Sequence, residues 1–161
     1  MKQFKFLAIA FVGVAVALVA CEPTATPKTS TTNYPFSSIY VGSHSSMTGS
    51  IKFTEDGNNT KLTVTLNNTL NATDYNLHVH DYADTATTPN NTPYNETPNS
   101  TILVGTIAGN GGTVSKDFTA THTYDHIMDT YAGGYFVVHD PTQPISTTNL
   151  TTYLIVGAFP N

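Results

Sequence analysis

The chain has 161 residues, a formal net charge of −5 and a charged fraction of only 11%. All six basic residues are lysine, so the sequence lacks the basic surface of a nucleic-acid-binding protein. Its single cysteine excludes an intrachain disulfide framework and a cysteine-based zinc finger. The length suits one domain, and a hydrophobic content of 39% is enough for a core.

Residues 1–20 have the pattern of a secretory signal peptide. Two lysines precede an uncharged apolar run, Phe6 to Val19, which is short for a stop-transfer helix. The run ends in Leu18-Val19-Ala20-Cys21, which resembles the bacterial lipobox. That resemblance implies cleavage before Cys21, acylation of Cys21, and a lipid-anchored location in the bacterial cell envelope outside the cytoplasm. The alternative is an uncleaved membrane anchor with an incidental cysteine.

Residues 21–33 are predicted to be a tether. After the lipidated cysteine, this stretch is rich in proline and threonine and has no apolar periodicity. Removal of the signal would take away two of the six lysines and none of the eleven acidic residues, so the net charge would fall from −5 to −7.

The remaining residues, 34–161, alternate between apolar and polar with a period of two. Residues 61–66 alternate strictly, Ile51 and Phe53 alternate before them, and Asp56-Gly57 predicts the turn between the two strands. Only Asp125–Thr130 suggests a helical turn. Further strands are expected at Tyr75–Asp81, Leu103–Ala108, Thr113–Thr119, Gly134–Asp140 and Tyr153–Ala158. The pattern predicts an all-β fold, a Greek-key sandwich or barrel of about seven to eight strands.

Three histidines in two distant strands suggest a metal site. In the strand Tyr75–Asp81, residues two apart point the same way, so His78 and His80 should share the face opposite the core. His139 ends an apolar strand much later in the chain. Imidazole suits copper and zinc. We therefore expect His78, His80 and His139 to meet around one metal ion, the alternative being unrelated surface histidines.

The order of these motifs resembles that of Cu/Zn superoxide dismutases. The matching segments are Gly49-Ser50-Ile51-Lys52-Phe53, Leu77-His78-Val79-His80-Asp81, Gly105-Thr106-Ile107, Gly111-Gly112-Thr113-Val114, Val137-Val138-His139-Asp140 and Ile155-Val156-Gly157-Ala158. The resemblance covers roughly Met47 to Phe159. It implies a superoxide dismutase-like β-sandwich in which His78, His80 and His139 match three of the family's four copper ligands.

The sequence also departs from that family. The loop from Tyr82 to Ile102 has no histidine, and its only acids are Asp84 and Glu96, so no dedicated zinc site is recognised. The family's guiding arginine and loop disulfide are missing as well. A negative net charge should repel superoxide rather than attract it. Copper is therefore the expected cofactor, zinc remains an alternative, and no residue is assigned a catalytic role.

Four other residues are secondary candidates. His122 and His126 lie four apart, so on a helix they would share a face and could add a metal ligand, although a solvated loop is the simpler interpretation. Asp81 and Asp140 each follow a candidate ligand. Adjacent strand residues point to opposite faces, so either aspartate would act by orienting a neighbouring imidazole rather than by binding the metal.

Three functions remain open at this stage. The first is a lipid-anchored copper-binding domain that handles copper or gives weak oxidant defence. The second is a metal-free surface scaffold or adhesion module, similar to chordin-type (CHRD) domains. The third is an active superoxide dismutase whose missing ligand comes from His122, His126 or a partner chain. The membrane and a metal ion are the expected partners; no protein partner can be named.

Overall fold

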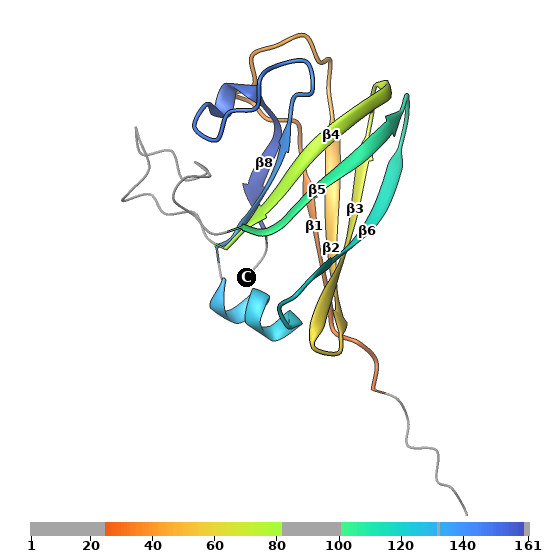
Figure 1. Cartoon of the computed structure of the whole chain (residues 1–161), viewed down its shortest axis with the longest axis vertical. Coiled ribbons are helices and arrows are strands. Elements are labelled where there is room, and N and C mark those ends of the chain that lie inside the picture. The colour runs from red at the N-terminus through yellow and green to blue at the C-terminus, as the bar shows by residue number, and fades with distance from the viewer. Residues whose placement is uncertain (1–24, 82–100, 132, 160–161) are drawn as a thin grey trace, which may run out of the picture.

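The computed structural model describes residues 25–81, 101–131 and 133–159. In these residues the chain forms eight strands in two four-stranded antiparallel sheets, which enclose a shared hydrophobic core (Figure 1). The predicted all-β sandwich is therefore confirmed. The strands are β1 (Thr29–Tyr34), β2 (Thr48–Asp56), β3 (Asn59–Asn67), β4 (Asn71–His80), β5 (Thr101–Asn110), β6 (Val114–Ala120), β7 (Tyr135–His139) and β8 (Tyr153–Ala158).

The first sheet has the order β1-β2-β3-β6, and its inner face follows from the period-two pattern. Asp56 pairs with Asn59 across the β2–β3 hairpin, so the predicted turn is confirmed. Gly57 in this two-residue loop has φ of +60°, a conformation that glycine adopts without steric cost. The fully buried apolar residues of β2 and β3 are Ile51, Phe53, Leu62, Val64 and Leu66.

The second sheet has the order β5-β4-β7-β8. Strands β3 and β6, and likewise β4 and β7, are hydrogen-bonded neighbours although they are not consecutive in the chain, so the chain crosses between the sheets as in Greek-key folds. Figure 1 shows β5 and β6 side by side where the two sheets meet. The inner face of β4 and β7 consists of Tyr75, Leu77, Val79, Phe136 and Val138.

The predicted tether ends earlier than the sequence suggested. Residues 21–33 were expected to lack structure, but Thr29–Tyr34 form edge strand β1 and pair with β2 from Thr54 to Gly49. Strand β1 carries mostly serine and threonine on its half-exposed surface and buries only Tyr34. Because the backbone ladder supplies its pairing, hydrophobic periodicity could not reveal it.

Two short helical segments complete the described chain. The expected helical turn at Asp125–Thr130 is present, and its hydrogen bonding is that of a π-helix, η2 (His126–Thr130), anchored by the buried side chain of Ile127. A 3₁₀ turn, η3 (Leu150–Thr152), leads directly into β8. No helix in the ranges that the structure describes has the length and apolar character needed to cross a bilayer.

Strand β7 is buried on both faces, and this feature positions the candidate site. All five of its residues are buried. Phe136 and Val138 face the main core. Tyr135 and Val137 face outward and join Leu150 and Tyr153 in a second, smaller apolar cluster. We call this surface of β4, β7 and β8 the outer face of the second sheet.

Candidate metal site

The strand register brings His78, His80 and His139 to the outer face. His78 lies opposite Val137 and His80 opposite Tyr135 in the antiparallel β4–β7 pair, and directly opposed residues project to the same side of a sheet. Alternation along β7 then puts His139 on that side too. His80 and His139 are each 2% exposed, whereas His78 is half-buried. Two strands distant in sequence thus assemble one group of imidazoles.

The three imidazole rings are neighbours. The ring centres of His78 and His139 are 4.9 Å apart with their planes at 67°. Those of His78 and His80 are 5.7 Å apart at 73°. Two imidazoles bound to one ion through metal–nitrogen bonds of 2.0–2.1 Å would hold their ring centres roughly 4.5–5.5 Å apart. The distance from His78 to His139 falls within this range, and that from His78 to His80 is slightly longer.

The three rings do not yet form a ready-made metal site. Across residues 25–81, 101–131 and 133–159, no set of three or more His, Cys, Asp or Glu side chains is arranged to hold a metal ion. The expected meeting of three nitrogens at one point is thus not present in these side-chain conformations. Because His78 touches both other rings and is the least buried, it is the ring with room to turn toward a shared ion.

Two tyrosines that the sequence analysis overlooked flank the histidines. Tyr135 stacks on His80 with ring centres 4.9 Å apart and an angle of 14°. Tyr153 meets His139 edge-on, also at 4.9 Å. Both tyrosine side chains are fully buried and fix the planes of the two buried imidazoles. Period two along β7 could have revealed Tyr135, since it lies four residues before His139.

Asp140 is part of a hydrogen-bonded network at the end of β7. Its Oδ1 accepts from the backbone N–H and the hydroxyl of Thr142, at 2.8 and 2.7 Å. Its Oδ2 accepts from Tyr40 Oη at 2.6 Å and Gln143 Nε2 at 2.8 Å. Burial raises the pKa of Asp140, but these hydrogen bonds outweigh it and hold the pKa below its usual 3.8.

This network changes the role expected for Asp140. The predicted role was to orient an imidazole, but the hydrogen bonds of the described residues join its carboxylate to Tyr40, Thr142 and Gln143. Asp140 therefore ties the segment before β2 to the segment after β7. Asp81 is half-buried and directly follows His80.

His44 lies at the edge of the main core, away from the roles considered above. It is 7% exposed, and its Nε2 is 3.1 Å from Tyr75 Oη. The Tyr75 oxygen also accepts from the backbone N–H of Leu70 at 2.6 Å, which leaves its own proton to donate to His44. Burial lowers the pKa of His44, only partly offset by the charge of Asp140.

His122 and His126 form a separate group. Their ring centres are 5.3 Å apart with the planes nearly parallel, at 11°. Tyr131 contacts both rings, and its hydroxyl is 3.3 Å from His122 Nε2. His122 and His126 thus contact each other's ring and that of Tyr131, apart from the group formed by His78, His80 and His139.

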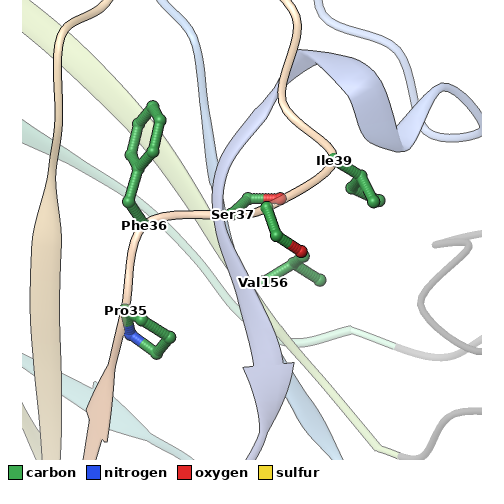
Figure 2. A pocket seen from close by; sticks show the side chains of 6 residues that line it. Pro35, Phe36, Ser37, Ile39 and Val156 are labelled. Atoms are coloured by element: carbon green, nitrogen blue, oxygen red, sulfur yellow. The ribbon is translucent and has the colours of Figure 1, made fainter.

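An open groove lies beside edge strand β8. Figure 2 shows that residues Pro35, Phe36, Ser37, Ile39 and Val156 line it, together with Ser38. None of these six side chains is titratable or a metal ligand, so the groove lacks the metal-binding groups of the outer face.

Comparison with known proteins does not assign the chain to a family, so a function has to be argued from its own residues. No protein-family model matches the chain, and a search of curated proteins finds no match. The predicted signal peptide, Cys21, and the loop acids Asp84 and Glu96 lie outside the described residues.

Proposed function

We propose that the protein is a lipid-anchored, extracytoplasmic metal-binding domain that holds one copper ion through His78, His80 and His139. The observation that carries the proposal is the pairing of His78 with both other imidazoles, at 4.9 and 5.7 Å between ring centres. Imidazole nitrogen is a preferred ligand of copper. The two-sheet sandwich is compatible with a superoxide dismutase-like fold, and the sequence resemblance supports that finer assignment.

The residues around the histidines suit a site that holds its metal firmly. Tyr135 and Tyr153 fix the planes of His80 and His139, which limits the conformational entropy lost when these rings bind. His78 then moves to complete the set. A copper ion held there would supply one-electron chemistry. The protein residues would bind the ion, restrict its geometry and keep most water away.

Copper handling is favoured over rapid dismutation. Fast capture of superoxide needs a positive path to the metal, and the sequence has no arginine and a net charge of −5 before any processing. Weak oxidant defence remains compatible with a copper site. A fully competent superoxide dismutase is therefore the less supported alternative.

A metal-free scaffold of the chordin-type kind is the second candidate, and one observation favours it. In the described ranges no three metal-ligating side chains are already arranged around a point. Under this alternative the histidines and tyrosines only pack the outer face, and the sandwich serves as a surface module on its lipid anchor.

Copper titration separates these functions. The mature chain carrying Cys21→Ser, which removes the lipid, would be titrated with Cu(II) and Zn(II) in parallel with His78→Ala and His139→Ala. We expect tight copper binding at these three histidines, and the affinity of that site should fall at least about tenfold in both variants. Asp74→Ala is the control, because Asp74 is exposed on the same strand, β4, and outside the histidine group.

The outcomes are distinct. Equal copper binding in the parent, both histidine variants and the control would reject the three-histidine site and favour the scaffold. A rate of superoxide loss well above that of free copper, measured on the loaded chain, would instead favour the dismutase.

A further inference from the structure

The group formed by His122, His126 and Tyr131 has no part in the proposed function. It lies where β6 ends and η2 begins. Other features outside the histidine face are already explained: the Asp140 carboxylate has four hydrogen bonds, and the groove beside β8 has no titratable lining. We propose that His122, His126 and Tyr131 form a second, independent site for a divalent transition-metal ion.

The spacing of the two imidazoles fits a shared ion. Their ring centres are 5.3 Å apart, within the roughly 4.5–5.5 Å expected for two imidazoles on one metal. Their planes are stacked at 11°, so the in-plane nitrogens do not converge in this arrangement, and the exposed ring of His126 would turn to share the ion. His122 lies in the bend before the helical segment, and His126 is the first residue of η2. His126 is exposed, so an ion can reach its ring.

Tyr131 supplies the third donor atom. Its hydroxyl oxygen is 3.3 Å from His122 Nε2, which is long for an O–H···N hydrogen bond. Two atoms bound at about 2.0–2.1 Å to one tetrahedral ion lie roughly 3.3 Å apart. The ring of Tyr131 also meets that of His126 at 4.7 Å between centres. Tyr131 therefore contacts both imidazole rings, and its oxygen lies at ligand spacing from His122 Nε2.

The backbone explains why these three side chains come together. In a π-helix each hydrogen bond spans five residues, so Tyr131 lies one wide turn after His126. An ordinary α-helical turn would place residue 130 there instead. Such π turns are rare and occur frequently at functional sites. The π turn thus brings the ring of Tyr131 into contact with that of His126.

His122 is held in place before any ion binds. Its backbone oxygen accepts a hydrogen bond of 2.8 Å from Thr60 Oγ1, and Thr60 is fully buried on β3. The Nδ1 atom of His122 is shielded from solvent and has no hydrogen-bond partner among the described residues. Its Nε2, which faces Tyr131, is therefore the nitrogen placed to bind.

The local charge favours a cation. Asp125 and Asp129 both lie on the helical segment that carries His126. Lys28 neutralises Asp125 through an ion pair of 2.6 Å, which leaves Asp129 as a nearby negative charge. Binding would release the phenol proton of Tyr131 to solvent as its oxygen coordinates the ion.

The test isolates this site from the first. The Cys21→Ser chain with both His78→Ala and His139→Ala would be titrated calorimetrically with Zn(II), and far-UV circular dichroism would check its fold. We expect one Zn(II) per chain, weakened at least about tenfold by the further change His126→Ala. Thr130→Ala is the matched control, because Thr130 is exposed on the same helical segment and is not a proposed ligand, and we expect its affinity to stay within about twofold of the parent.

A second readout identifies Tyr131 as a ligand. With Cu(II) in place of Zn(II), coordination by the phenolate oxygen should give a tyrosinate-to-copper charge-transfer band in the visible spectrum. Tyr131→Phe should abolish that band while the imidazole ligands remain. The measurement also applies to the chain with all histidines intact, so it does not depend on the double variant folding.

Two results would overturn the proposal. One is Zn(II) binding that is unchanged by His126→Ala in the folded chain. The other is a Cu(II) spectrum that is identical in the parent and Tyr131→Phe. Neither result bears on the copper site at His78, His80 and His139, whose own test uses variants on β4 and β7.

Discussion

The two faces of the second sheet are both buried along β7, but they are buried by different means. The inner face packs Phe136 and Val138 into the main core, where residues from both sheets contribute. The outer face carries Tyr135, Val137 and His139 against a small cluster and a set of hydrogen-bonded segments. Apolar area stabilises the first face, whereas polar contacts hold the second, and the three histidines of the proposed copper site lie on the outer one.

The connection after β7 shows how the outer face becomes buried. Asp140 N–H donates to the backbone oxygen of Thr152, at 3.0 Å, and this contact folds the segment back toward β8. The η3 turn then presents Leu150 to the small cluster. His139 is therefore enclosed by a segment whose position depends on hydrogen bonds.

The largest expected effect tests that dependence. Asp140→Asn would keep the shape of the side chain but place an amide N–H₂ group against donors, because all four partners of the carboxylate donate to it. We expect a loss of about 3 kcal/mol in the free energy of unfolding, since hydrogen bonds to a buried charge are worth about 1.5–3 kcal/mol each. Urea denaturation of the metal-free chain measures it.

A matched exposed aspartate gives the control for Asp140. Asp74→Asn on β4 removes a charge from an exposed position, and we expect it to stay within about 0.5 kcal/mol of the parent. A similar small effect for Asp140→Asn would mean that the outer face is held by its apolar cluster after all.

A smaller loss in the free energy of unfolding is expected when the two faces are compared through single substitutions on β7. Val137 and Val138 are adjacent on β7 and both fully buried, but they face opposite sides. Val138→Ala should cost about 2 kcal/mol, from two lost methyl groups and a cavity that the large core cannot close. Val137→Ala should cost about 1 kcal/mol, because the small cluster relaxes more easily. Equal costs in urea denaturation would contradict the distinction between the faces.

The sequence predicted the inner face well and the outer face only in part. Leu77, Val79 and Val138 follow the period-two rule, which depends on local alternation alone. The same rule predicted that His78 and His80 share a face, and the strand register bears this out. It could not predict the pairing of β4 with β7 that brings His139 beside them, because pairing is a long-range property of the fold.

Other misses have similar physical causes. Strand β1 is stabilised by its backbone ladder with β2, and a serine- and threonine-rich sequence gives no hydrophobic pattern by which to detect it. The partners of Asp140 lie on two separate loops, so adjacency to His139 in the chain suggested the wrong contact. Tyr131 reaches His126 only because η2 is a π turn, which single-sequence periodicity does not specify.

The smallest effect concerns a histidine on the inner side. His44 meets Tyr75 of the main core and has a lowered pKa because of its burial. Its folded pKa lies below the unfolded 6.5, so the unfolded state binds more protons just below that value. This contribution to stability is complete above about pH 6.5 and is lost as the pH falls through the folded pKa.

Comparing urea denaturation at about pH 7.5 and about pH 5 would measure that loss. His44→Gln keeps a side chain able to accept from Tyr75 but cannot gain a proton, so the difference between the two pH values should be smaller in this variant than in the parent. The subtraction removes contributions from the other titrating groups, which both chains share. The same pH dependence in both chains would show that folding does not lower the pKa of His44, and that this histidine contributes nothing to the pH dependence of stability.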